Sequence, residues 1–462
     1  MLLRGGSRGS AAGSPSASGL PPAALVEGWS AGIHANAGWY CPASCPDRAR
    51  ALFSGAKGQF HASVDPQALR IRFPVSPPLP AGGVSFCTCW TDIMKTFHTF
   101  DTPDGWASAA EAFRDDFATG GRIQVAPWGG YAILGHQELV SLARNPLADG
   151  MAPDPAAMAD TPALLSLLDR ALFTKSGDAH RTQRAALIAA FNTVPLAGIA
   201  REAVRRALPS GPARIDLRAG LIAPVVRRVW GDIIGLDATA ALQLEDAVRD
   251  MAHVLSLSPD PAKAHLAEAA AGRVRDLSLA ALEGGTPFSR NLRDRLGDGL
   301  AADLIAGMAF DAIESAATGL DAALRVAFAH RRQVTATAQC ANECLRLASS
   351  TPMTMRLTTG RIALGDLAMQ AGTVLSMVWA AGNHDPLAFP APERFDPDRQ
   401  GARPLMFGTG QHACLGHAII RATLVQLLGV LEAFAPEAGT PPARWSPFAQ
   451  DSLPALGIRF EG

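Results

Sequence analysis

The stretch LMFGTGQHACLGHAII, residues 405–420, constrains the fold of this 462-residue chain more than any other part of the sequence, and we call it the cysteine segment. Cys414 lies there in a glycine-rich turn, directly ahead of a long apolar run. If a helix begins after the turn, its free backbone N–H groups and dipole stabilise a thiolate. Gly410 and Gly416 allow tight turns, and Phe407 can shield the sulfur from water. This arrangement suits one strong axial metal ligand rather than a four-ligand zinc site.

The same segment contains a longer pattern, F-x-x-G-x-H-x-C-x-G. Its members are Phe407, Gly410, His412, Cys414 and Gly416. The pattern resembles the haem-binding loop of the cytochrome P450 family, in which a cysteine thiolate binds the haem iron. The resemblance extends over about residues 95–460. It implies a mainly α fold with a small β part, in which haem b (iron protoporphyrin IX) lies between a long central helix and the loop of the cysteine ligand.

A second motif, ECLR, places Glu343 and Arg346 three residues apart and therefore on one face of a helix. Further along the chain, PERF supplies Arg394. Taken alone, ECLR is usually a solvent-exposed ion pair. The resemblance to the P450 family instead implies that Glu343, Arg346 and Arg394 form a buried salt-bridge network beneath the haem.

A third motif, DAHRTQR, places His180 and Arg184 four residues apart on one helical face. Two cations aligned in this way suit a carboxylate, and haem has two propionate groups. A lone pair of this kind is otherwise a solvated helix face. The resemblance implies that His180 and Arg184, together with Arg356 and His412, bind the propionates.

The segment DAIES in the expected central helix departs from the family motif A-G-x-(Asp/Glu)-Thr. Glu314 keeps the acid, whereas Ala312 replaces glycine and Ser315 replaces threonine. In the family the acid and the alcohol deliver protons during dioxygen activation, so the resemblance implies catalytic roles for Glu314 and Ser315. A register on Thr318 has no acid before it, and a polar stripe on a surface helix is the other interpretation. We also expect the Ser315 hydroxyl to bond back to the carbonyl of Asp311.

The first 92 residues differ from the rest because they are rich in Gly, Ser, Pro and Ala and have no sustained periodicity. Four of the seven cysteines lie there: Cys41, Cys45, Cys87 and Cys89. These cysteines could form a zinc site, could have no metal role, or could belong to a segment that is not translated natively. We expect residues 1–92 to be a disordered or non-native extension, with a native start near Met94 and a haem-thiolate domain over 93–462.

Hydrophobic periodicity predicts mostly helical structure after the extension. The expected elements are a hairpin over 121–135, a long buried helix over 298–330, a helix over 333–349, short strands within 365–383, an irregular meander over 384–404 and an amphipathic helix over 414–436. Gly129 and Gly130 are expected at the hairpin turn. Cys340 and Cys344 are expected to be core packing residues.

Composition limits where the chain acts and what it binds. A net charge of −1 gives no electrostatic basis for binding nucleic acid. No run of about 18 apolar residues occurs, so no transmembrane helix is expected, and the N-terminus lacks the apolar core of a signal peptide. Seven cysteines in 462 residues do not form a disulfide framework, which favours a reducing cytoplasm.

The resemblance implies a haem-thiolate monooxygenase that inserts one atom of dioxygen into a small, mostly apolar organic substrate. The chain shows no flavin or nicotinamide fingerprint, so a ferredoxin and its NAD(P)H-dependent reductase are the expected electron donors. Met308, Ala309, Phe310 and the turn Pro352–Met355 are expected to shape the substrate pocket. The alternatives are a peroxide-driven or isomerising haem-thiolate enzyme and a haem-binding relative without turnover.

Overall fold

The computed structural model describes residues 113–119, 121–126, 129–150, 155, 158–255, 261–365, 367–437 and 455–461. These residues all lie within one compact unit, Pro80–Gly462. The predicted extension over 1–92, its four cysteines and the expected start near Met94 lie outside the described residues and stay predictions.

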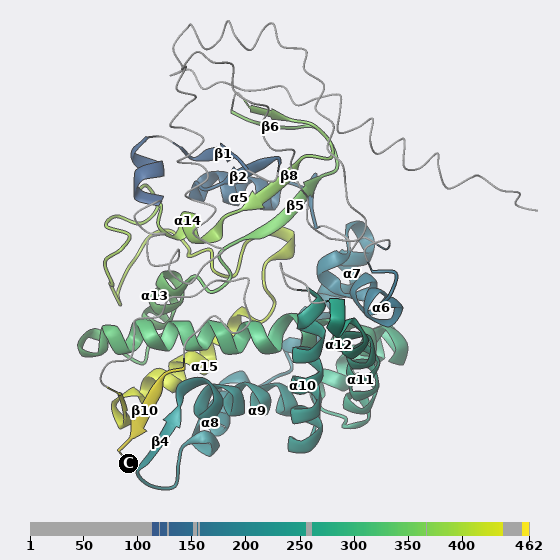
Figure 1. The fold of residues 1–462 in the computed structure, drawn as a ribbon, viewed down its shortest axis with the longest axis vertical. Helices are drawn as coiled ribbons and strands as arrows, with labels where there is room; N and C mark the ends of the chain where they lie inside the picture. The colour runs from purple at the N-terminus through teal and green to yellow at the C-terminus, as the bar shows by residue number, and fades with distance from the viewer. Residues whose placement is uncertain are drawn as a thin grey trace, which may run out of the picture. The chain divides into compact units, whose positions relative to one another are not determined.

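Helices form most of the described chain, and the expected mainly α fold with a small β part is confirmed (Figure 1). The α-helices are α5 (His136–Arg144), α6 (Pro162–Arg170), α7 (Gly177–Phe191), α8 (Leu196–Ala207), α9 (Ala223–Ile234), α10 (Ala238–Leu255), α11 (Ala264–Glu283), α12 (Pro287–Ala329), α13 (Ala338–Ala348), α14 (Trp379–Asn383) and α15 (His417–Gly429). Shorter helical turns are η1 (Leu172–Thr174), η2 (Leu217–Ile222), η3 (Pro261–Lys263), η4 (Arg331–Gln333), η5 (Gly410–His412) and η6 (Leu431–Ala433).

Helix α12 is the central element of the unit. The Thr286 hydroxyl accepts a hydrogen bond from the backbone N–H of Ser289 and caps the first turn, and proline occupies the first helical position. Gly297, at φ 75°, interrupts the helical backbone, so the long segment begins after it. In Figure 1 this segment runs between strands β1, β2, β5 and β8 on one side and α8, α9 and α10 on the other. The helix predicted over 298–330 is therefore confirmed.

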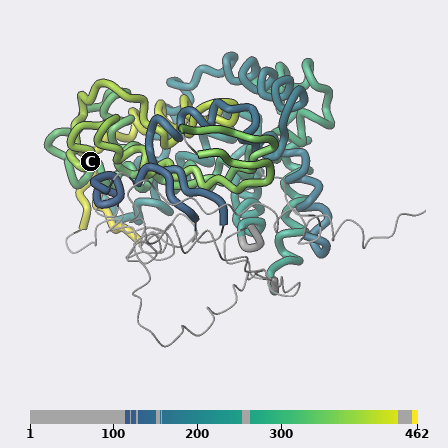
Figure 2. Tube along the Cα trace, turned by 90° about the horizontal axis from the view of Figure 1, so that it is seen from above, coloured from purple at the N-terminus to yellow at the C-terminus, as the bar shows by residue number. Residues whose placement is uncertain are grey.

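The strands form three small sheets. They are β1 (Ile123–Val125), β2 (Tyr131–Ile133), β3 (Ala148–Asp149), β4 (Ala213–Asp216), β5 (Thr354–Thr358), β6 (Ile362–Leu364), β7 (Leu367–Met369), β8 (Val374–Met377), β9 (Phe434–Pro436) and β10 (Gly457–Phe460). The strand orders are β1-β2-β8-β5-β3, β4-β10-β9 and β6-β7. Seen from above in Figure 2, β1 and β2 (blue) lie beside β5 and β8 (green), as the pairing of β2 with β8 requires.

The predicted hairpin is confirmed in β1 and β2, which pair antiparallel. Gly129 and Gly130 both have positive φ, at 99° and 75°. A Cβ on Gly130 would overlap the backbone carbonyl of Val374 on β8, so a side chain is excluded there. This glycine lets the hairpin join the five-stranded sheet.

Helix α15 differs from its prediction in extent and character. The sequence predicts an amphipathic helix over 414–436, whereas the helix ends at Gly429 and is followed by η6 and β9. It is apolar over most of its circumference because α8, α12 and α13 all pack against it. Helix α13 lies within the predicted range 333–349 but begins only at Ala338. The strands within 365–383 and the irregular meander are confirmed, and Cys340 and Cys344 are fully buried as expected.

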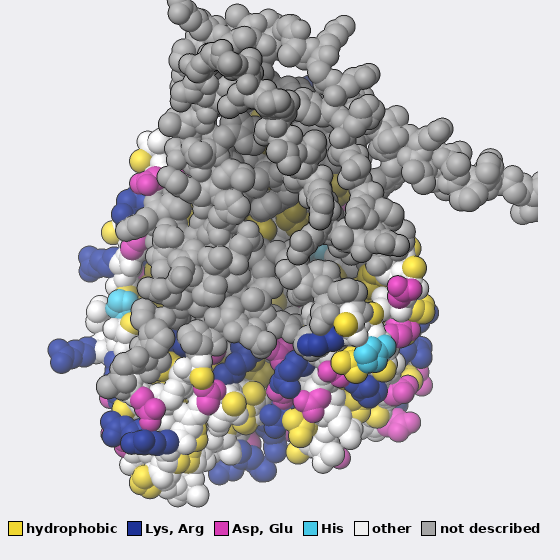
Figure 3. Space-filling view, viewed as in Figure 1, with side chains coloured by type: hydrophobic (Ala, Val, Ile, Leu, Met, Phe, Trp, Pro, Cys, Tyr) yellow, Lys and Arg dark blue, Asp and Glu magenta, His cyan; other side chains and the backbone are white. Residues whose placement is uncertain are grey.

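Charged side chains of both signs are interspersed on the described part of the face in Figure 3. No single helix of the described residues is long and apolar enough to cross a membrane. Only the pair α7 and α8, which is bent by 66°, meets that criterion of length and composition when the two helices are joined.

Candidate active site

Backbone hydrogen bonds fix the cysteine segment. The N–H of Cys414 donates to the carbonyl of Phe407 over 2.9 Å. The backbone N–H groups of Gly416 and His417 donate to the Cys414 sulfur at the start of α15, where such donors favour a thiolate. Gly410 has a φ of 75°, and a Cβ there would overlap a backbone carbonyl of α5. Gly410 therefore allows the cysteine segment to pack closely against α5, and this packing fixes the position of the Cys414 sulfur.

The Cys414 sulfur is accessible and yet closely surrounded by protein atoms. Its side chain is accessible to solvent. Burial among surrounding protein atoms, together with the negative charge of Asp311, nevertheless raises the pKa of the thiol to about 11. A metal cation bound to the sulfur would reverse this pKa shift, because coordination deprotonates a thiol.

Asp311 and Ser315 lie one turn apart on one face of α12. Both side chains are exposed, whereas Ile313 and Ala316 on the same helix are buried. Burial raises the pKa of Asp311 to about 6, so protein atoms surround this accessible carboxyl group too. Its charge acts on Cys414, which puts the two groups within electrostatic range.

The two predicted catalytic residues lie on different sides of α12. The Ser315 hydroxyl donates to the carbonyl of Asp311 over 2.6 Å, which confirms the predicted back-bond. Glu314 projects elsewhere, because neighbouring residues are about 100° apart around a helix. Its carboxylate pairs with Arg218 at 2.6 Å and lies 3.6 Å from Arg249. Glu314 also lines a separate cavity of ≈260 Å³, whose lining residues do not include Ser315.

The predicted propionate partners lie together beside the cysteine segment. The rings of His180 and His412 are 4.6 Å apart between centroids. Nε2 of His412 lies 3.0 Å from a carboxylate oxygen of Asp149. Burial, followed by the charge of Arg356, lowers the pKa of His412 to about 4, so the ring is neutral at pH 7. Arg184 donates to a carbonyl of the cysteine segment over 2.7 Å.

The hydrogen-bond donors of this cluster suit an anionic ligand. Nε2 of His180 is a buried polar atom without a hydrogen-bond partner among the described residues. Burial lowers the pKa of both Arg184 and Arg356. Their described hydrogen bonds go only to backbone carbonyls. Buried donors of this kind require acceptors, and the carboxylates of haem propionates would satisfy them.

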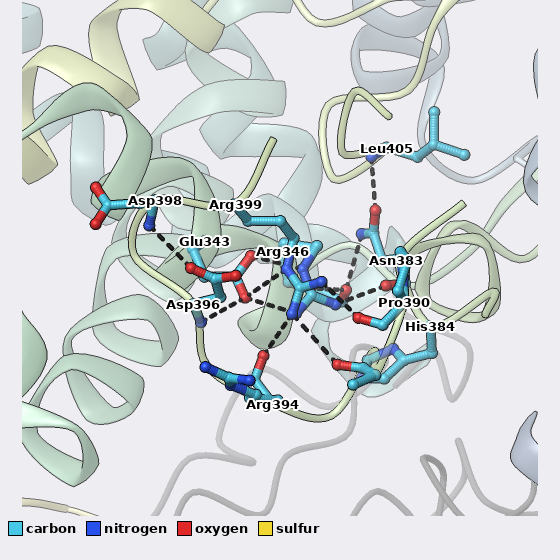
Figure 4. A network of polar contacts seen from close by, with 12 residues as sticks. Glu343, Arg346, Asn383, His384, Pro390, Arg394, Asp396, Asp398, Arg399 and Leu405 are labelled. Carbon is cyan, nitrogen blue, oxygen red and sulfur yellow. Dashed lines mark hydrogen bonds and ion pairs between the residues drawn. The ribbon is translucent and has the colours of Figure 1, made fainter. Parts of the chain in front are cut away.

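A buried ionic network lies at the helix α13 motif (Figure 4). Glu343 and Arg346 are buried and form a bidentate pair at 2.7 and 2.8 Å. Arg346 also donates to the carbonyl of Asn383, and the backbone N–H of Asp396 donates to Glu343. The predicted buried pair is confirmed, and it ties α13 to α14 and to the meander.

The second arginine of the network is Arg399 and not Arg394 as predicted. Arg399 lies 3.0 Å from Glu343 and also donates to the carbonyls of Pro390, Ala391 and Arg394. Arg394 therefore contributes its backbone carbonyl, while its side chain is exposed. The meander turns back on itself here, so the residue five positions later reaches Glu343.

Sequence reasoning missed four residues that complete these sites: Asp149, Arg218, Asp311 and Arg399. Arg218 lies on η2, 96 residues before Glu314, and no local pattern indicates that contact. Asp149 likewise meets His412 across 263 residues. Asp311 did have a signal, because its spacing of four from Ser315 places both on one helix face.

Comparisons with known proteins agree with this fold and site. A family model described as Cytochrome P450 matches residues 314–442. Over 81 residues the chain is 42% identical to Putative cytochrome P450 140 of Mycobacterium tuberculosis, covering 17% of this chain and 18% of that protein. Over 234 residues it is 26% identical to C-19 steroid 1alpha-hydroxylase of Sorangium cellulosum, covering 46% of this chain and 59% of that protein. The matched segments thus span less than two thirds of these relatives.

The fold is also similar to that of solved structures. P450BioI, in complex with hexadec-9Z-enoic acid ligated acyl carrier protein, matches with a TM-score of 0.67 at 19% identity, covering 76% of this chain and 98% of that one. Fold and site together define the class of haem-thiolate proteins. The chain shares its fold and the matched segment 314–442 with the cytochrome P450 family, whose cofactor is haem b. The donor cluster and the accessible Cys414 sulfur fit that cofactor.

Arg184→Ala is expected to weaken haem retention about tenfold or more, because a charge-assisted hydrogen bond is worth roughly 1.5–3 kcal/mol. The measurement is the rate of haem transfer to apomyoglobin, with the melting of the apo protein recorded in parallel. Arg181→Ala, on the same helix but at an exposed side chain that pairs with Asp178, is the matched control and should not change the rate. An unchanged transfer rate for Arg184→Ala would remove Arg184 from the propionate site.

Proposed function

We propose that the chain is a haem-thiolate monooxygenase that inserts one atom of dioxygen into a small, mostly apolar organic substrate. The observation that supports this best is the accessible Cys414 sulfur at the start of α15, with Asp311 of α12 within electrostatic range of it. The cationic cluster beside it supplies donors for both propionates. C-19 steroid 1alpha-hydroxylase, one of the relatives, is named for such an oxygen insertion.

In this proposal Cys414 is the only protein ligand of the iron. His180, Arg184, Arg356 and His412 hold the propionates, and Phe407, Gly410 and Gly416 shape the loop around the sulfur. When bound, haem supplies the redox chemistry of dioxygen activation, which a thiolate ligand promotes through its electron density. The residues of this chain orient the cofactor, exclude water and supply protons.

Ser315 and Glu314 are the proposed proton carriers. The proton of Ser315 points at the carbonyl of Asp311, so the hydroxyl must rotate before it can donate to a bound ligand. Glu314 borders the ≈260 Å³ cavity and is paired with Arg218. It must leave that arginine to pass a proton towards Ser315. Proton delivery in this chain therefore requires two side-chain movements.

A ferredoxin and an NAD(P)H-dependent reductase are the proposed electron donors. The test is a reaction with both proteins and NADH, compared with hydrogen peroxide alone, on a compound found by its shift of the haem absorption band. Incorporation of isotopically labelled dioxygen into product, coupled to NADH consumption, is the expected result. Product only with peroxide would favour the peroxide-driven alternative.

Ser315→Thr is expected to raise the yield of product per NADH, because a β-branched side chain restricts χ1 and aims the hydroxyl. Ser315→Ala should lower that yield and release more peroxide. Glu314→Gln should slow turnover more than it changes substrate affinity, since Glu314 lines the separate cavity with Arg218. Product, peroxide and NADH are counted together for each variant. Coupling equal to that of the parent in all three would exclude this pair as proton carriers.

A further inference from the structure

Asp321 is a buried acid of α12 with one carboxylate oxygen in use. Its side chain is 1% exposed, and its Oδ1 accepts a hydrogen bond from Nε of Arg325 over 2.6 Å. The other oxygen, Oδ2, is buried and has no hydrogen-bond partner among the described residues. A buried carboxylate oxygen without a donor is costly, because burial removes it from bulk water. Asp321 therefore has an open position for one more donor.

Arg218 lies close to this open position. Its Nη2 pairs with Glu314 at 2.6 Å, and its Nη1 donates to the hydroxyl of Thr318 over 3.0 Å. Thr318 comes four residues after Glu314 and three before Asp321, so these three side chains follow one face of α12. Burial raises the pKa of Asp321, and the charges of Arg325 and Arg218 oppose that rise. The guanidinium of Arg218 thus spans the first two of the three side chains and acts on the third.

The other acids near Arg218 are already engaged. Asp216, two residues before it, accepts backbone N–H groups with both of its carboxylate oxygens. Glu245 and Asp246 line the ≈260 Å³ cavity with Arg218, but they pair with other arginines. Among these described acids, Asp321 is the one that keeps an acceptor oxygen without a donor.

The surroundings of Arg218 allow it to move. It lies on η2, which is a π-helix, and π-helical segments are rare and are often found at functional sites. Its side chain borders the ≈260 Å³ cavity, so there is space beside the guanidinium for a change of rotamer. Without Arg218, Glu314 would keep only Arg249 at 3.6 Å, a half-exposed side chain, and such a pair is weak.

We propose that Arg218 has two positions along α12 and that Asp321 provides the second. In the first, Arg218 holds Glu314 at the cavity, as in this structure. In the second, the guanidinium donates to Oδ2 of Asp321, stays beside Thr318 and leaves Glu314 free to turn towards Ser315. This inference rests on the proposed function, because it concerns the release of a proposed proton carrier. Asp321 acts through Arg218 and is a positioning residue.

The first test is a crystal structure of the haem-loaded Glu314→Ala variant. Alanine removes the acceptor of the first position and is a good helix former, so Arg218 must find another partner. We expect a guanidinium nitrogen within hydrogen-bond distance of Oδ2 of Asp321. Asp246→Asn removes an exposed acid that pairs with Arg249, and in this matched control Arg218 should stay on Glu314. Any other position of Arg218 in Glu314→Ala, in solvent or against an acid of α10, would overturn the proposal.

A double-mutant cycle measures the same shift in solution. It combines Arg218→Met with Asp321→Asn, and the readout is the unfolding equilibrium constant of the haem-loaded protein in urea. The coupling between the two residues should be at least about tenfold larger in Glu314→Ala than in the parent, because the charge-assisted bond forms there. The effect of Asp321→Asn on Arg325 is common to both backgrounds and cancels. Equal coupling in both would overturn the proposal, and if Asp321→Asn does not fold, the crystal structure decides alone.

Turnover tests whether the second position serves the reaction. With NADH and both redox proteins, on a compound that shifts the haem absorption band, Asp321→Asn should lower kcat about tenfold and keep KM within about twofold. In an Arg218→Met background the same substitution should change kcat less than about twofold, since no cation remains to be held. Equal losses of kcat in both backgrounds would make Asp321 a structural residue and overturn its positioning role.

The crystal structure also separates this inference from the proposed function. Arg218 at Asp321 in the Glu314→Ala variant, without any dioxygen-dependent product from the parent, would keep the two positions and defeat the monooxygenase proposal. Arg218 elsewhere in that variant, with labelled oxygen in the product of the parent, would defeat the inference and leave the monooxygenase proposal intact.

Discussion

Cys414→Ser is expected to abolish the absorption band of the reduced, CO-bound protein that gives the P450 family its name. That band reports a thiolate ligand, and a serine hydroxyl remains protonated where a thiol ionises on metal binding. The N–H groups of Gly416 and His417 that donate to the sulfur cannot compensate, because they stabilise an anion that serine does not form. The loss should be complete, whatever fraction of haem is retained.

The measurement is the CO difference spectrum, normalised to haem content. Cys340→Ala is the matched control, because Cys340 is a buried cysteine on α13 and is not a proposed ligand. The control should retain the band if it folds. A band that survives Cys414→Ser would show that another residue ligates the iron and would remove the basis for the proposed chemistry.

Residues whose roles depend on local sequence could be predicted. The hairpin, the long part of α12, helix α13 and the turn before α15 all follow from spacing and from glycine at positive φ. The back-bond from Ser315 to the carbonyl of Asp311 also spans only one helical turn. These features require no knowledge of distant parts of the chain, which is why periodicity and motif spacing were sufficient.

Partners from distant segments could not be predicted. Glu314 meets Arg218 across 96 residues, and His412 meets Asp149 across 263. The network contains Arg399 where the sequence predicted Arg394. Which of the two arginines reaches Glu343 depends on how the irregular meander folds back, and no periodicity in the sequence predicts that. The apolar character of α15 depends on three helices that surround it. In each case tertiary packing decided which side chain occupies the position.

Glu343→Gln is expected to destabilise the protein by about 3–5 kcal/mol, the usual cost of removing one partner from a buried ion pair. Arg346 is fully buried, so its charge would stay in the interior without a carboxylate. Arg399 would lose the same partner, and the meander would lose its anchor to α13. Glutamine has almost the same shape, so the change tests charge rather than packing.

The test is the free energy of unfolding in urea for the haem-loaded protein, with Arg394→Ala as the matched control from the same meander. Arg394 contributes only a backbone carbonyl to the network, so that variant should cost less than about 0.5 kcal/mol, as other exposed substitutions do. A larger cost for Arg394→Ala than for Glu343→Gln would reverse the assignment of Arg399 and restore the network predicted from the sequence.

The pH dependence of the Glu343→Gln effect checks its electrostatic origin. Burial opposes ionisation of Glu343, but hydrogen bonds and charge from Arg346 and Arg399 outweigh it and hold the pKa below the ordinary 4.5. A depressed pKa in the folded state means that the stabilisation is complete well above 4.5 and is lost as the pH falls below it. The difference in stability between parent and variant should therefore be constant near neutral pH and shrink in acid. A difference that is the same at neutral and acid pH would show that the variant acts through packing instead of charge.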